Sequence, residues 1–109
     1  MIKGHQIQKK VKIGTFSDII NQYKEEDIRT TKHTFFRLRE KERKVFKDKV
    51  IKEYLLEQEP VLVGIQHNGN YAVFYRYNKD LLKVILDIQT PSINIVTFYI
   101  IDNNQMPKI

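Results

Sequence analysis

A histidine and an arginine lie four residues apart in the stretch Thr31 to Leu38. On a helix, side chains at this spacing stand one above the other on the same face, so His33 and Arg37 would project together. Metal-independent RNA cleavage needs a base, an acid and cations for the charge that builds on the phosphate. An imidazole titrates near neutral pH and can serve as base or acid, and a guanidinium can hold a phosphate with two parallel hydrogen bonds. We therefore take His33 and Arg37 as candidate catalytic residues.

The same spacing also supports two structural interpretations of this pair. Phe35, Phe36 and Leu38 point away from it on a helix, so His33 and Arg37 could simply occupy the solvated face of an amphipathic helix. Alternatively, His33 near the start of the helix could bond a loop carbonyl and fix the helix to the rest of the fold. All three interpretations remain open from the sequence.

The last apolar stretch has the alternation of a strand and brings two hydroxyl side chains to one face. Thr97 and Tyr99 on that face could donate hydrogen bonds to a phosphate, and we add them to the candidate catalytic residues. Ordinary strand composition is the alternative, because Thr and Tyr favour sheets in general. The alternation groups Ile95, Thr97, Tyr99 and Ile101 on this face, and Val96, Phe98 and Ile100 on the face that we expect to meet the helices.

Arginine and lysine side chains supply candidate contacts to nucleic acid. Arg76 lies in a strand rich in tyrosine, and alternation directs it away from Tyr75 and Tyr77, which we expect in the core. The run from Arg37 to Lys44 adds Lys41 and Lys44, either as a ridge that follows phosphates or as a solvated helix face with internal ion pairs. The formal net charge of +6 favours an anionic partner, although it is also compatible with a domain that only keeps its charge away from zero.

The elements that must position these residues indicate an α+β fold. A strand from Ile7 to Ile13 and a helix from Thr15 to Lys24, begun by a Thr15–Asp18 capping box, come first. Helical patterns follow up to Pro60, and the last of them predicts a helix that starts at Asp48 and carries an apolar stripe of Val50, Ile51, Tyr54 and Leu55. The Asn-Gly hairpin signal at Asn68 then opens a half rich in Val, Ile and Tyr. We expect helices on one face of a four-stranded, or larger, antiparallel meander, in a single domain 1–109 divided into residues 1–30, 31–59, 61–101 and a tail 102–109.

Several classes of site are excluded or disfavoured by composition. The chain has no cysteine, which excludes disulfides and thiolate metal sites, and its three histidines are too scattered for a zinc site. We expect neither a metal nor a cofactor. No apolar run reaches about 18 residues, so we expect no membrane span and a cytoplasmic location.

Together, these residues resemble a known family. A Thr-x-His-x-x-x-Arg-Leu helix start and a closing strand Ile-Val-Thr-Phe-Tyr are similar to the domain-of-unknown-function family 4258, which resembles RelE-like and BrnT-like toxins with barnase-type folds. The resemblance covers about Ile28 to Ile101. Thr34 replaces the usual small residue, and the helix from Thr15 to Lys24 is additional. The resemblance implies a small endoribonuclease that cleaves RNA without metal and has an antitoxin partner. Its motif residues correspond to His33, Arg37, Leu38, Thr97 and Tyr99.

Three functional hypotheses follow. The first is that toxin-like endoribonuclease, with His33, Arg37, Thr97 and Tyr99 in catalysis. The second is a non-catalytic module that binds nucleic acid through Arg76, Lys41, Lys44 and their neighbours. The third is an interaction domain whose sheet edge accepts a segment of a partner protein.

Overall fold

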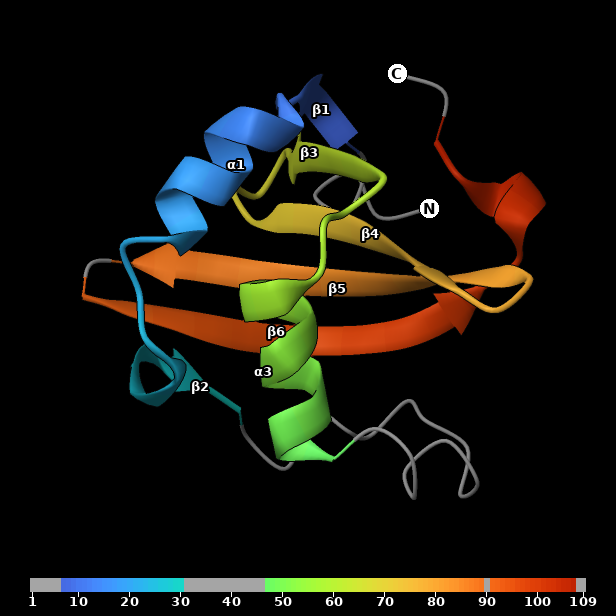
Figure 1. Ribbon diagram of the computed structural model, residues 1–109. Coiled ribbons are helices and arrows are strands. Elements are labelled where there is room, and N and C mark those ends of the chain that lie inside the picture. The colour runs from blue at the N-terminus through green and yellow to red at the C-terminus, as the bar shows by residue number, and fades with distance from the viewer. Residues whose placement is uncertain (1–6, 31–46, 90, 108–109) are drawn as a thin grey trace.

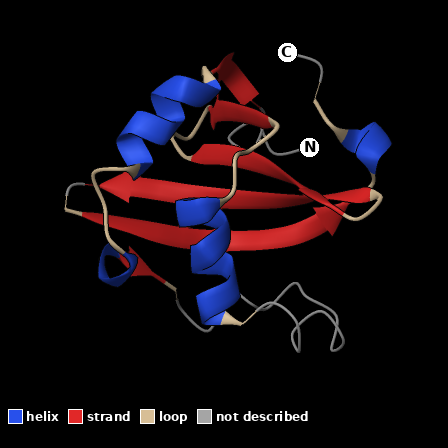
Figure 2. Ribbon diagram, viewed as in Figure 1, coloured by secondary structure: helices blue, strands red, loops and turns tan. Residues whose placement is uncertain are grey.

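Within the residues that it describes, the computed structural model of this protein is a six-stranded sheet with two helices on one of its faces (Figures 1 and 2). The structure describes residues 7–30, 47–89 and 91–107. The α+β class predicted from the sequence is confirmed. The strands are β1 (Ile7–Lys10), β2 (Ile28–Arg29), β3 (Leu62–Gln66), β4 (Tyr71–Tyr77), β5 (Asp80–Gln89) and β6 (Ser92–Ile101); the helices are α1 (Ile13–Ile20) and α3 (Asp48–Glu57), with short 3₁₀ turns η2 (Glu25–Asp27) and η4 (Asn103–Gln105).

The order of the strands is β1-β3-β4-β5-β6-β2, and it corrects the predicted sheet. Strands β3 to β6 pair in chain order as the expected antiparallel meander. β1 adds an antiparallel edge, whereas β2 pairs in parallel with β6, so the sheet has six strands and is mixed. Two residues are too few to show a periodicity, which is why β2 was not predicted.

The hairpin between β3 and β4 follows its Asn-Gly signal, with one difference. Gly69 has a φ of 89°, a left-handed conformation that costs glycine little, whereas Asn68 does not share it. The side chain of Asn68 instead accepts a hydrogen bond from the amide of Asn70 at 3.0 Å. In the next turn, Asn78 has a φ of 52°. Both turns thus use residue types that tolerate positive φ.

Helix α1 begins and ends earlier than the sequence predicted. It starts at Ile13 after Lys12, so Thr15 lies inside the first turn and does not cap the helix. Phe16 and Ile20, one turn apart, are 1% and 3% exposed and fix the helix against the sheet. After Ile20 the chain tightens, with the amide of Tyr23 donating to the Ile20 carbonyl at 3.0 Å.

Helix α3 begins at Asp48, as predicted, and buries Ile51 and Leu55 on the same face of the sheet as α1 (Figure 1). Tyr75 lies under it, 1% exposed, with its ring edge-on to Tyr54 at a centroid distance of 5.5 Å. The expected core position of the tyrosines is therefore confirmed for Tyr75. The main core also includes Val63, Val73, Leu82, Val84, Leu86, Ile93, Ile95 and Phe98 from the four central strands.

A bulge in β6 overturns part of the alternation predicted for that strand. Leu86 pairs with Ile95 and Ile85 pairs with Thr97, so Val96 is an extra residue with no counterpart in β5. Ile95 consequently joins the main core, at 2% exposed, and Val96 is 43% exposed. Phe98, beyond the bulge, packs in the main core as expected.

Candidate functional site

Three of the predicted site residues, Arg76, Thr97 and Tyr99, share the face of the sheet opposite α1 and α3, which we call the outer face. Cross-strand pairing joins Phe74 to Lys83 and Lys83 to Tyr99. One step along the sheet, Thr97 pairs with Ile85, which pairs with Ala72, and on the other side Arg76 pairs with Leu81. Ala72, Phe74 and Ile85 from these rows form a second, smaller apolar cluster together with Leu62.

Lys83 is a residue of the outer face that the sequence reasoning missed. Its ammonium lies 5.6 Å from the centre of the Phe74 ring and 5.5 Å from that of Tyr99, so it is held by cation–π attraction from both neighbouring strands. Within the described residues, no carboxylate pairs with it; the ion pair found there joins Lys52 to Asp48. A lysine in the middle of the apolar run from Leu81 to Ile88 was the signal that could have identified it.

Arg76 lies diagonally across from Lys83 on the outer face. Diagonal neighbours of this kind are about 7–8 Å apart, within the reach of two long side chains. Arg76 is exposed, and its Nη1 donates a long hydrogen bond of 3.4 Å to Oδ1 of Asn103 in η4, which follows β6 beside this end of the sheet (Figure 1). The two cations can therefore act on one anion.

Thr97 contributes a polar atom without a partner. Its hydroxyl oxygen is buried, and it makes no hydrogen bond in the part of the chain that the structure describes. A buried hydroxyl left unsatisfied costs about 1–3 kcal/mol. A ligand could satisfy the hydroxyl only once the side chains that cover it move aside, because the oxygen has almost no exposed surface.

His33, Arg37, Lys41 and Lys44 lie outside the described residues, so their predicted roles stay predictions. The residues that flank their segment, Thr30 and Asp48, contact each other. Oγ1 of Thr30 donates to Oδ1 of Asp48 at 2.5 Å, and Lys52 forms an ion pair with Asp48 at 2.9 Å. Thr30 and Asp48, which flank the segment 31–46 on its two sides, are thereby held next to each other.

Asp48, at this junction, has a lowered pKa. Its partial burial raises the pKa, but the hydrogen bonds from Thr30 and Lys52, together with the charge of Lys52, outweigh that effect. The carboxylate therefore stays ionised and keeps both hydrogen bonds at neutral pH.

The charge of the protein is distributed very unevenly between these parts. The described residues contain eleven Lys and Arg and eleven Asp and Glu, so they are formally neutral. The segment 31–46 contains six Lys and Arg and two Glu, a net charge of +4 out of the +6 of the chain. The positive field of the molecule thus originates mainly in the segment that begins and ends at the Thr30–Asp48 hydrogen bond.

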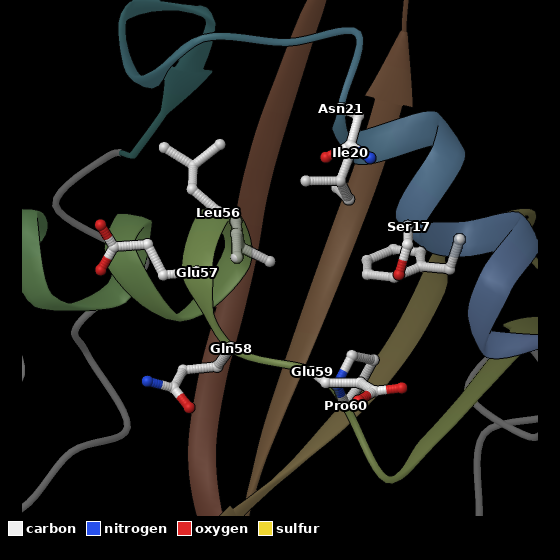
Figure 3. A pocket seen from close by; sticks show the side chains of 10 residues that line it. Ser17, Ile20, Asn21, Leu56, Glu57, Gln58, Glu59 and Pro60 are labelled. Atoms are coloured by element: carbon white, nitrogen blue, oxygen red, sulfur yellow. The ribbon is translucent and has the colours of Figure 1, made fainter.

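A groove of about 200 Å³ opens on the other side of the sheet, between α1 and the C-terminal end of α3 (Figure 3). Phe16 and Ile20 line it from α1, and Leu55 and Leu56 line it from α3. Among the residues that the structure describes, no Lys or Arg lines it. The remaining lining residues are Ser17, Asn21, Glu57, Gln58, Glu59 and Pro60.

The described ranges contain neither a cluster of metal-binding side chains nor a helix that could span a membrane. No group of three or more His, Asp or Glu side chains there is placed to hold a metal ion. None of the helices there has the length and apolarity needed to cross a bilayer.

A comparison with protein families identifies the chain. The model of the MJ0788 family matches residues 14–86. The chain belongs to the MJ0788 family. The match spans α1 through most of β5 and includes the segment 31–46, while Thr97 and Tyr99 of β6 lie beyond it. Searches of curated proteins and of solved structures found no match.

This result corrects the family resemblance drawn from the sequence. The matching model is that of the MJ0788 family, and nothing in the comparisons points to domain-of-unknown-function family 4258 or to RelE-like toxins. The motifs behind that resemblance were short. A Thr-x-His-x-x-x-Arg-Leu pattern suits many amphipathic helices, and Ile-Val-Thr-Phe-Tyr suits many strands, because both follow general propensities.

Proposed function

We propose that this MJ0788-family protein binds nucleic acid, RNA in the first place, through phosphate contacts from the segment 31–46. The observation that supports this most strongly is the charge distribution. A net charge of +4 over sixteen residues, beside described residues that are formally neutral, concentrates the attraction for a polyanion in one segment. A solubility role alone gives no reason for such concentration.

The outer face supports the same function with a second set of contacts. Arg76 and Lys83 are diagonal neighbours, and Lys83 has no carboxylate partner among the described residues. Thr97, a diagonal neighbour of Lys83 in β6, adds a buried hydroxyl that has no hydrogen-bond partner in the described structure. Two cations and a hydroxyl on one face are the groups that position a nucleic-acid backbone.

RNA cleavage by His33 and Arg37 stays a prediction alongside this proposal. The chemistry argued for the pair still holds for the residue types, although the resemblance that first suggested a ribonuclease is wrong. A cytoplasmic location belongs to the same proposal, as does an acidic partner protein that competes with RNA for the segment 31–46.

The test is titration of labelled RNA oligonucleotides with purified protein at several salt concentrations, in the presence of a chelator. We expect binding that weakens steeply with salt, because neutralised phosphates release counterions, and that survives His33→Ala. If the same reactions yield RNA cleavage products and His33→Ala abolishes them, the protein is also a ribonuclease that depends on His33. Absence of salt-dependent binding by the wild-type protein would overturn the proposal.

A further inference from the structure

We propose that the groove between α1 and α3 binds a small organic cation with an apolar body, about the size of one arginine side chain. This site lies on the helix side of the sheet and is independent of the nucleic-acid function proposed above. The ten residues that line it all fall within the range matched by the MJ0788 family.

The volume of the groove sets the size of the ligand. At about 200 Å³ it is smaller than the 300–1,000 Å³ typical of sites for drug-sized molecules and cofactors. It is larger than the 150 Å³ or so of an engineered cavity that holds benzene. One ring or a short alkyl chain with a single charged group matches this space.

The apolar walls come from both helices. Phe16 and Ile20 are almost fully buried on the α1 side, and Leu55 is buried on the α3 side, where Leu56 remains partly exposed. In Figure 3 the side chain of Ile20 extends from α1 toward α3. Because Phe16, Ile20 and Leu55 are already almost out of contact with water, a ligand would gain stability mainly by covering the exposed part of Leu56.

The polar rim selects for positive charge. The side chain of Glu59 extends across the lower end of the groove toward α1, whereas that of Glu57 turns away from the gap (Figure 3). α3 ends at this rim with no basic residue in its last turn, and the last carbonyls of a helix have no amide partner within it. Their partial negative charge adds to that of Glu59. The described lining residues include no Lys or Arg that would repel a cation.

The experiment compares benzamidinium with its neutral isostere benzamide in ¹⁵N NMR titrations of the full chain. We expect benzamidinium to shift the amides of Ser17, Asn21 and Gln58 and to bind at least five-fold more tightly than benzamide. Glu59→Gln should remove that preference, and Glu26→Gln, which removes an exposed carboxylate away from the groove, should leave it unchanged.

Each other outcome overturns the site. Equal shifts by the charged and neutral probes would show that the groove does not select a cation. Equal effects of Glu59→Gln and Glu26→Gln would show that only the overall charge matters. Absence of shifts at all three amides, with the protein folded, would show that the groove takes no such ligand.

Discussion

Replacing Thr97 with valine should make the protein more stable while weakening its binding to nucleic acid. The hydroxyl oxygen of Thr97 is buried without a hydrogen-bond partner in the described structure. Valine keeps the shape of threonine and removes the polar atom. If most of the roughly 1–3 kcal/mol penalty of an unsatisfied hydroxyl is recovered, the free energy of unfolding should rise by about 1 kcal/mol. In a domain of this size, that corresponds to about 4 °C in Tm.

Tyr75 provides the matched control. Its hydroxyl is also buried without a partner in the described structure, but it lies under α3 on the opposite side of the sheet. Tyr75→Phe should therefore raise the unfolding free energy by a similar amount and leave binding unchanged. The contrast separates a hydroxyl that is only unsatisfied from one that is kept for a ligand.

The assays are urea denaturation followed by circular dichroism and salt-dependent titration with labelled RNA for both variants. Loss of about 1 kcal/mol or more of stability in Thr97→Val would refute the reasoning, because it would mean that the hydroxyl is satisfied in the folded state. Unchanged RNA affinity in a stabilised Thr97→Val would remove Thr97 from the site.

Three further predictions concern the scaffold. Gly64→Ala should destabilise the protein, because a Cβ at Gly64 would lie 2.5 Å from Cγ2 of Ile7, and a double-mutant cycle with Ile7→Ala by urea denaturation should recover much of the loss. Thr30→Val should raise the pKa of Asp48, measured by NMR titration, and an unchanged pKa would refute the role of Thr30. Because the pKa of Asp48 is lowered in the folded state, its contribution to stability is present above the pKa of the unfolded state and is lost as the pH falls through the pKa of the folded state. Burial raises the pKa of Tyr75, so above about pH 10 an unfolded phenol ionises while the folded one does not, and wild-type stability should fall with rising pH more steeply than that of Tyr75→Phe; parallel pH profiles would contradict this.

Local patterns predicted much of the fold because they depend on near neighbours in sequence. The alternation in β4 placed Arg76 opposite the buried Tyr75, and the start of α3 at Asp48 followed from its apolar stripe. Features that depend on residues far apart in the sequence could not be predicted. The pairing of β2 with β6 joins Ile28 to Ile93, and the bulge at Val96 exists only in relation to β5.

The candidate site was accessible from the sequence only in part. Thr97 and Tyr99 were placed on the correct face, because the strand beyond the bulge keeps its alternation. Lys83 was not singled out, since its position between Phe74 and Tyr99 follows from the register of three strands. The groove is lined by residues of α1 and α3 that lie about forty positions apart in the sequence, so no local pattern could predict it.

The central claim is that nucleic acid is attracted by the segment 31–46 and not by net charge in general. The most direct measurement is the dependence of RNA affinity on salt for two variants that each lose five positive charges. One replaces Arg37, Arg39, Lys41, Arg43 and Lys44 with Gln, and the other replaces the exposed Lys9, Lys10, Lys24, Lys49 and Lys79 with Gln. Each phosphate contact contributes about 0.7 to the slope of log affinity against log salt for a single strand, so the first variant should lose up to about 3.5 of that slope and the second very little. Equal losses in the two variants would contradict the claim.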